Sequence, residues 1–235
     1  IGFVVLLACV ARIVHLDADP YYANWVGHIT DEGRWSEIAR NLALFGSPDS
    51  TPLTRVQLLL SPGYQAANYA SFLVFDVGFW SARIFAAVSG MLIVVVAFVV
   101  LRRHVTAFAL GVGVVILGFE TNLLAESRMA LPEVPSAFAS LAAFLVLVLA
   151  RPTKWSAFLA GVLAAVALSL KGTTGFVILI FPFIILFCPD DGSLRARIPR
   201  AAAFLAGLLS VTGAGLASAY MLGLTNLQGL ANALK

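Results

Sequence analysis

Long apolar runs constrain this chain more than any other feature of its sequence. Soluble domains have about 25% charged residues, whereas 11% of these 235 residues are charged and 60% are hydrophobic. Because so few charges cannot cover a surface that faces water, lipid must be the solvent for most of the chain. There are seven apolar runs, at residues 1–16, 80–101, 105–119, 132–150, 155–170, 173–188 and 200–222.

The runs predict α-helices, because a segment in hydrocarbon must satisfy its backbone hydrogen bonds internally. Several are shorter than the ~20 residues that cross a bilayer, and tilt or neighbouring apolar positions would supply the missing length. Short links join 80–101 to 105–119 and 155–170 to 173–188, which predicts two helical hairpins. We therefore expect an all-α fold, a polytopic transmembrane helical bundle.

The predicted domain organisation is simple. Residues 80–222 are expected to form transmembrane helices, and 17–79 to form an outer loop. Together with the first run they make residues 1–235 a single transmembrane domain. Because the chain starts inside an apolar run and stops just after another, we expect it to be the N-terminal part of a longer chain.

The placement of charges predicts the orientation. Cytoplasmic loops are rich in Lys and Arg, and an outward first run puts every acid except Asp190 and Asp191 at the outer face. The same orientation places these basic residues on the cytoplasmic side: Arg102, Arg103, Arg151, Lys154, Arg195, Arg197 and Arg200. We therefore expect an integral membrane protein whose working face is the outer one.

The outer loop contains one segment with helical spacing, residues 31–46. Apolar side chains recur there every three or four positions, for example at Trp35, Ile38 and Leu42. Thr30 is a candidate N-cap, and Gly46 suits the end of the helix. The segment predicts an amphipathic helix on the membrane surface.

A second loop helix is predicted to follow Ser61-Pro62-Gly63 and to run through the sequence YQAANYASFLVF. Its Tyr64 and Tyr69 suit the depth at which the bilayer meets water. We therefore expect a pair of interfacial helices in this loop.

Asp31 and Glu32 are the first candidates for chemistry. Two adjacent carboxylates at the start of a membrane-surface helix could supply a general base or hold a cation. The alternative is structural, because acids are favoured in the first turn by the helix dipole. Spacing alone leaves both interpretations open.

A second group of candidates lies in a short outer loop. Glu126, Arg128 and Glu133 are ionisable groups at the membrane edge, where charges are costly unless they are paired or functional. Arg128 could pair with either acid, or the group could form part of a site. Lys171 could bind a phosphate, or could simply extend its side chain to the interface.

Other polar residues carry less weight. Arg83 lies four residues into its apolar run and could pair with Asp76 or Asp31. Cys9 and Cys188 lie in apolar runs without a His or CxxC partner, as expected of buried small side chains. No basic stripe with interleaved aromatics indicates nucleic acid as a partner.

Four stretches of this sequence resemble the GT-C superfamily of polyprenyl-phosphate-sugar glycosyltransferases. The resemblance is to the bacterial branch that includes protein O-mannosyltransferases and aminoarabinose lipid A transferases. The stretches are DEGRWSEIARNLALFG (31–46), SPGYQAANYASFLVFDVGFWSARIFAAVSG (61–90), ESRMALPEVPSAF (126–138) and SLKGTTGFVILIFP (169–182). They stand in the family's order and spacing. The resemblance implies a GT-C-like fold in a bacterial plasma membrane, with the active site on the outer face.

The resemblance also implies roles for particular residues. Asp31 and Glu32 match the family's acidic pair, with Asp31 as the base that takes the proton of an acceptor hydroxyl. The donor would be a sugar on a polyprenyl phosphate, transferred with inversion. Arg128 and Lys171 would offset charge on the phosphate oxygens. Glu133 would orient the acceptor or help to hold a divalent cation.

One departure from the family concerns phosphate binding. Relatives often have Lys-Pro-Pro where this chain has Ser61-Pro62-Gly63. The missing lysine argues against the aminoarabinose branch, and Arg55 is the candidate substitute. The resemblance leaves the sugar open, as well as the acceptor, which could be a lipid, a glycan or a protein.

The alternative function is a transporter or flippase for a lipid-linked or anionic solute. A transporter is expected to place ionisable residues near the bilayer midplane on broken helices, often in two related halves. Here the charges gather at one face, and no half-repeat is visible. The pattern therefore favours a membrane glycosyltransferase.

Overall fold

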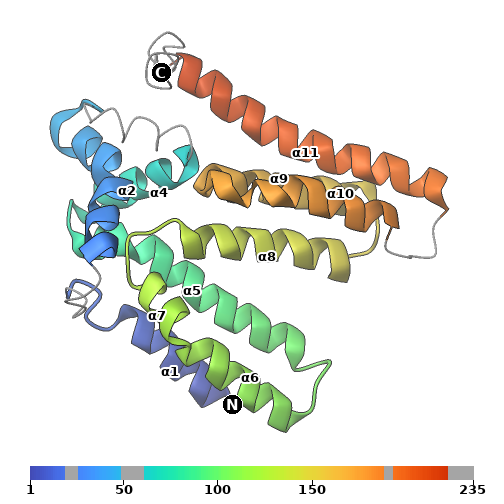
Figure 1. The fold of residues 1–235 in the computed structure, drawn as a ribbon, viewed down its shortest axis with the longest axis horizontal. Coiled ribbons are helices and arrows are strands. Elements are labelled where there is room, and N and C mark those ends of the chain that lie inside the picture. Colours follow the sequence, from blue (N-terminus) through green and yellow to red (C-terminus); the bar gives the residue numbers. More distant parts are fainter. Residues whose placement is uncertain (19–25, 49–60, 188–192, 222–235) are drawn as a thin grey trace. The chain divides into compact units, whose positions relative to one another are not determined.

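The computed structural model describes residues 1–18, 26–48, 61–187 and 193–221, with side chains at 26–31, 178 and 216–221 left out (Figure 1). These residues form helices and connecting turns and contain no strand, which confirms the predicted all-α fold. The helices are α1 (Gly2–Ile13), α2 (Val26–Phe45), α4 (Pro62–Phe75), α5 (Phe79–Leu101), α6 (Ala107–Phe119), α7 (Thr121–Ser127), α8 (Glu133–Leu149), α9 (Lys154–Leu170), the 3₁₀ helix η1 (Gly172–Phe176), α10 (Val177–Phe187) and α11 (Leu194–Met221).

Every predicted apolar run contains a helix, and the helices differ in length. By length and composition, α5 and the Leu194–Gly215 part of α11 can cross a membrane. Helices α6 and α7 meet at a bend of 51° and would add a third crossing if they form one broken span. The remaining apolar helices, α1, α8, α9 and the η1–α10 stretch, are shorter. These helices belong to an integral membrane protein.

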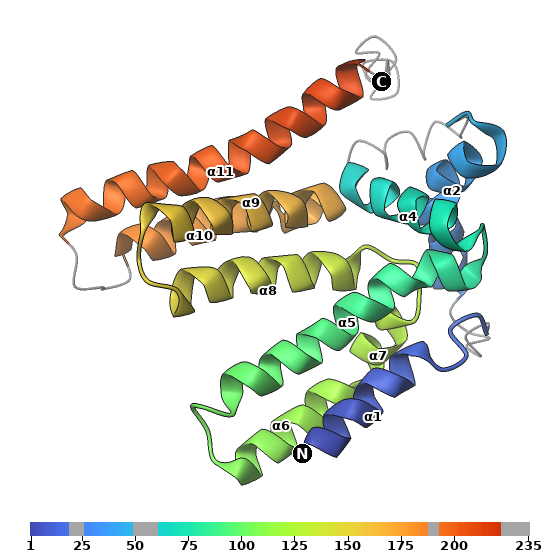
Figure 2. The same ribbon diagram turned by 180° about the vertical axis from the view of Figure 1, so that it is seen from behind.

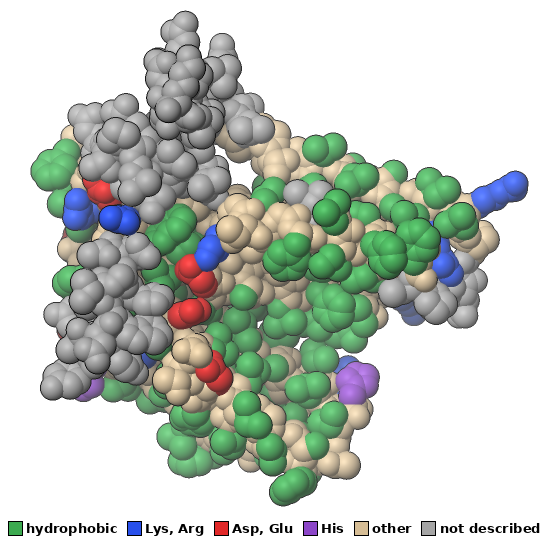
Figure 3. All heavy atoms as spheres, viewed as in Figure 1, with side chains coloured by type: hydrophobic (Ala, Val, Ile, Leu, Met, Phe, Trp, Pro, Cys, Tyr) green, Lys and Arg blue, Asp and Glu red, His purple; other side chains and the backbone are tan. Residues whose placement is uncertain are grey.

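Large apolar side chains cover much of the visible helix surface (Figure 3). Phe108 is 83% exposed, Trp155 is 80% exposed and Leu179 is 77% exposed. A protein in water keeps such side chains inside or in small patches. Lipid tails accept them without cost, so the exposed surface fits a membrane environment.

Helix α2 begins earlier than the sequence predicts. It starts at Val26, so Thr30 lies inside the helix, and the prediction of Thr30 as N-cap is wrong. Residues 26–30 contain no proline, so they can continue the helix upstream of Asp31. The predicted end is confirmed: Gly46 adopts a left-handed φ of 66°, which glycine reaches without steric cost.

Helix α4 is present where the sequence predicts a second loop helix, but it begins at Pro62 and so includes Pro62 and Gly63, which were expected to precede it. The Tyr64 side chain is fully buried within the protein, and its depth in the membrane stays a prediction. It faces α5, where its ring lies 6.3 Å from that of Phe85. Packing between helices therefore decides the position of this tyrosine.

A glutamine side chain joins the two loop helices. Gln65 on α4 donates from Nε2 to the carbonyl oxygen of Trp35 at 2.6 Å, and its Oε1 accepts from the Ala39 amide at 3.3 Å. Both partners are backbone groups of α2, so the contact fixes the register of the helices. The predicted helix pair is present, and its position on the membrane surface stays a prediction.

Contacts divide the chain into two compact units. The first comprises Ile1–Thr54 and Tyr64–Phe138, and the second comprises Arg55–Gly63 and Ala139–Lys235. Within the first unit, α1 lies beside α5 and α6, and α7 packs against α5 (Figures 1 and 2). The expectation that residues 1–235 form one transmembrane domain stays a prediction.

The second unit is built on close packing of α9 against α11. A Cβ atom added at Gly161 would overlap the Phe204 carbonyl oxygen, and one at Gly207 would overlap that of Phe158. The two backbones therefore touch, the packing that small residues allow between membrane helices. Phe204 is fully buried beside Phe181, with the ring centroids 6.1 Å apart.

Candidate functional site

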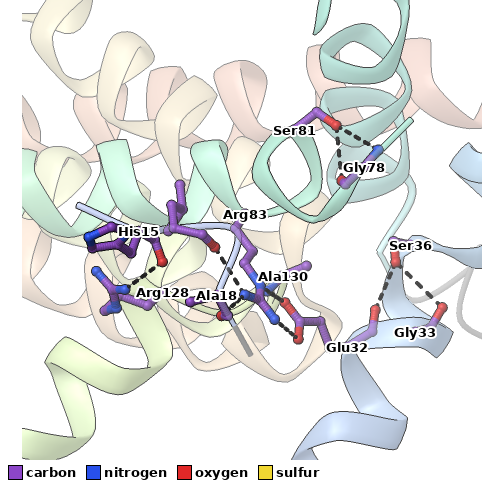
Figure 4. Close-up of polar contacts among 11 residues, drawn as sticks. His15, Ala18, Glu32, Gly33, Ser36, Gly78, Ser81, Arg83, Arg128 and Ala130 are labelled. Carbon is purple, nitrogen blue, oxygen red and sulfur yellow. Dashed lines mark hydrogen bonds and ion pairs between the residues drawn. The ribbon is translucent and has the colours of Figure 1, made fainter. Parts of the chain in front are cut away.

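A buried ion pair joins two distant parts of the first unit. The Nε atom of Arg83 on α5 donates to Oε1 of Glu32 on α2 at 2.5 Å, and its NH2 donates to Oε2 at 2.9 Å (Figure 4). The two side chains are only 1% and 6% exposed. A fork of this kind combines charge attraction with a fixed geometry, so it holds α2 against α5.

The same ion pair reaches two further segments. The Ala130 amide, in the turn between α7 and α8, donates to Oε1 of Glu32 at 2.7 Å. NH1 of Arg83 donates to the carbonyl oxygens of Leu16 and Ala18, at 2.9 and 2.6 Å. Four segments of the chain therefore converge on one carboxylate and one guanidinium (Figure 4).

Local structure presents Arg83 to this site. Helix α5 begins after Gly78, whose amide donates to Oγ of Ser81 at 3.0 Å (Figure 4). The Ser81 hydroxyl in turn donates to the Asp76 carbonyl at 2.6 Å. This cap fixes where α5 starts and so places Arg83 on the face that meets Glu32.

A second arginine binds the end of α1. NH1 of Arg128 donates to the carbonyl oxygens of Ala11 and Val14, at 2.6 and 2.8 Å, and its NH2 donates to that of His15 at 2.9 Å. The last carbonyls of a helix have no partner within it, and they form the negative end of its dipole. Arg128 satisfies these groups with charge-assisted hydrogen bonds.

The positive charges at this end of the unit influence each other. Partial burial, and then the charge of Arg83, hold the pKa of Arg128 below its ordinary value. A guanidinium nevertheless stays charged at neutral pH. An anion that reached Arg128 would therefore relieve repulsion as well as gain hydrogen bonds.

A third arginine is buried deeper. Arg12 on α1 is fully buried and donates from NH1 to the carbonyl oxygens of Ala8 and Gly118, at 2.8 and 2.9 Å. Its contacts tie α1 to the C-terminal end of α6. Arg12, Arg83 and Arg128 therefore all donate hydrogen bonds to carbonyl groups of α1 or of the residues that follow it.

A comparison with protein-family models identifies the family of this chain. The sequence model of the dolichyl-phosphate-mannose-protein mannosyltransferase family matches residues 40–197 of the chain. The chain belongs to this family. It is therefore a membrane glycosyltransferase of the kind that uses a polyprenyl-phosphate sugar donor. No curated protein and no solved structure matches the chain.

The family match covers some of the predicted site residues and not others. It includes Arg55, Arg128, Glu133 and Lys171 and begins after the acidic pair. The Asp31 side chain lies outside the described part of the structure, although its backbone belongs to α2. Arg55 also lies outside the described residues. Their predicted roles therefore stay predictions.

The other predicted residues are placed as follows. Glu32 and Arg128 belong to the first unit, as does Glu133, which lies in the first turn of α8. Lys171 ends α9 in the second unit, where its carbonyl oxygen accepts from the Thr174 hydroxyl at 2.7 Å. The structure thus gathers part of the predicted site in one unit.

Sequence reasoning did not identify the partner of Arg83. It offered Asp76 and Asp31 as possible partners, and the structure pairs Arg83 with Glu32. The available signal was an arginine inside an apolar run, since such a charge requires a partner. The other residues that sequence reasoning passed over are Arg12, Tyr64 and Asn68, all fully buried.

The sequence left open whether the protein holds a divalent cation. The described residues contain no cluster of three or more His, Cys, Asp or Glu side chains that could hold a metal ion. Glu32, a member of the acidic pair, already accepts hydrogen bonds from Arg83 and Ala130. Its carboxylate is therefore engaged by protein groups.

Proposed function

We propose that this protein transfers a sugar from a polyprenyl phosphate to an acceptor hydroxyl at the outer membrane face, with Asp31 as general base. The observation that carries the proposal is the anchored carboxylate of Glu32. It is held by Arg83 and by the Ala130 amide, and Asp31 is the preceding residue on the same helix. Anchoring Glu32 therefore restrains the backbone of the proposed base.

The proposed step is a single displacement. The Asp31 carboxylate takes the proton of the acceptor hydroxyl while the oxygen attacks the anomeric carbon. The bond from that carbon to the phosphate oxygen breaks, and the polyprenyl phosphate leaves with the electron pair. Because attack and departure occur on opposite faces of the sugar, the anomeric configuration inverts.

Cationic residues would stabilise the departing phosphate. Arg128 is the best supported of them, because it is held by three carbonyl groups in the same unit as Glu32. Lys171 and Arg55 keep their proposed roles as phosphate-binding residues, and Glu133 its proposed role in orienting the acceptor. Preorganised charges of this kind stabilise the transition state without reorganisation.

In this proposal Glu32 is a positioning residue. Its oxygens accept hydrogen bonds from Arg83 and Ala130, so it is poorly placed to take a substrate proton. This divides the acidic pair into a base, Asp31, and an anchor, Glu32.

The family's name guides the choice of substrates for a first test. It specifies a mannose on dolichyl phosphate and a protein acceptor. We propose a polyprenyl-phosphate mannose and a hydroxyl-bearing peptide as the first pair, with a pentose donor in parallel. A bacterial plasma membrane with an outer active site is part of the same proposal.

A transfer assay with the reconstituted full-length protein tests the base. Asp31→Asn should lower the transfer rate by ~10²-fold or more, because an amide cannot accept the proton. Asp76→Asn is the matched control, since Asp76 is exposed and has a left-handed φ that asparagine tolerates. Unchanged transfer by Asp31→Asn would refute the assignment. Counterflow in proteoliposomes without a covalent product would instead support a transporter.

A further inference from the structure

Two polar side chains of α4 are buried with little hydrogen bonding. The Tyr64 hydroxyl and both polar atoms of the Asn68 amide are inaccessible to solvent, and none of the three makes a well-formed hydrogen bond to a residue that the structure describes, although Asn68 lies near enough to lower the pKa of the phenol. Nearly all buried polar groups in folded proteins have a partner, so each exception requires an explanation. Here three such atoms come from two residues one helical turn apart.

Gln65, on the same helix, is an example of a buried polar side chain with a structural role. Both ends of its buried amide have backbone partners on α2. The fold therefore satisfies a buried amide where that amide holds helices together. Tyr64 and Asn68 follow a different pattern, because their polar atoms are withdrawn from solvent and interact with each other rather than with the backbone of a described neighbouring helix.

The surroundings of Tyr64 indicate what kind of group could bind there. Burial raises the pKa of the phenol, Asn68 offsets part of the rise, and the charges of Glu32 and Glu133 raise it further. The phenol therefore stays protonated and can donate a hydrogen bond.

The three polar atoms match a hydroxyl group. Asn68 offers a donor in Nδ2 and an acceptor in Oδ1, and the tyrosine hydroxyl can act as either. A substrate hydroxyl likewise donates once and accepts once. Sites built to hydrogen-bond a hydroxyl discriminate strongly against analogues that lack it.

We propose that Tyr64 and Asn68 bind a hydroxyl of the sugar carried by the lipid donor, which makes them specificity-determining residues. This inference rests on the proposed function. It adds a binding site for the neutral part of the donor to the cationic residues proposed for its phosphate.

The test combines donor binding, kinetics and stability. Tyr64→Phe removes one hydroxyl and keeps the ring that lies near Phe85. It should raise the dissociation constant of an unreactive phosphonate analogue of the donor, and the KM for the donor, by ~10-fold or more. Asn68→Leu should do the same. The KM for the acceptor should stay as in the wild type.

The stability readout separates binding from a structural role. Because the deleted atoms make no well-formed hydrogen bond to a described residue, both variants should keep or raise the midpoint of thermal unfolding. Tyr69→Phe on the same helix is the matched control and should change neither quantity. Gln65→Leu should lower the midpoint, because it deletes two hydrogen bonds.

Monodeoxy donors identify the hydroxyl. For one monodeoxy donor, the affinity of the wild-type protein should fall to the affinity that Tyr64→Phe has for the complete donor. Tyr64→Phe itself should bind that monodeoxy donor and the complete donor equally well.

Wild-type donor affinity in Tyr64→Phe and Asn68→Leu would overturn the proposal and leave a buried water as the partner. A raised KM for the acceptor alone would also overturn it. Donor binding without any transfer by the wild type would refute the proposed function, while the binding comparison would still decide this inference.

Discussion

Glu32 and Arg83 lie fifty-one positions apart in the sequence and meet in a buried, two-pronged ion pair. The pair is the junction of the first unit, because it also binds the Ala130 amide and the carbonyl groups of Leu16 and Ala18. Breaking it removes contacts from the end of α1, from α2, from α5 and from the turn before α8.

Arg83→Gln should destabilise the protein by about 3–5 kcal/mol, because it leaves the Glu32 carboxylate buried without its cation. Glu32→Gln should cost less, since an amide still accepts from Ala130. The double variant should lose less than the sum of the single losses. Chemical unfolding in detergent measures all three. Arg102→Gln, exposed at the other end of α5, is the control. Strictly additive losses would show that the pair contributes nothing as a unit.

Arg128→Lys should loosen the end of α1. Lysine keeps the charge but lacks the planar fork that reaches three carbonyl oxygens. We expect faster hydrogen exchange at residues 14–18, where the chain follows α1, and a loss of about 1–3 kcal/mol. The exposed Arg103→Lys should change neither. Equal exchange in the two variants would contradict the role of Arg128 as the clamp on α1.

Gly161→Ala should separate α9 from α11. The added methyl group would overlap the Phe204 carbonyl oxygen, and overpacking of this kind costs about 1–3 kcal/mol. Gly113→Ala is the matched control, since its Cβ would meet no atom within 4 Å. Helix propensity predicts that the control is neutral or slightly stabilising. Unfolding midpoints that fall equally in both variants would refute backbone contact at Gly161.

Tyr64 should make stability depend on alkaline pH. Its pKa in the folded protein is raised above the ordinary value of 10.0, chiefly by burial. The folded state therefore holds this proton more tightly than the unfolded state, and its contribution is complete below about pH 10 and declines above it. Tyr64→Phe should lose less stability than the wild type between pH 9 and pH 11, as followed by unfolding midpoints. Parallel curves would contradict the burial of an ionisable phenol.

The sequence predicted the helices well because their causes are local. Apolar runs force internal backbone hydrogen bonding in lipid, and the left-handed Gly46 ends α2. The start of α2 was missed, because Thr30 resembles an N-cap only if the residues before it leave the helix. Lengths also differ: α5 and α11 are long enough to cross a membrane, whereas α1 and α8 are shorter.

The amino-acid sequence by itself determined an all-α membrane protein and its family, because composition, helical spacing and motif order are properties of neighbouring residues. Tertiary structure alone decided that Arg83 pairs with Glu32 and that Tyr64 is buried beside α5. The physical reason is that a buried charge takes whichever partner the packed helices bring within hydrogen-bond distance. That choice depends on contacts between residues far apart in the chain.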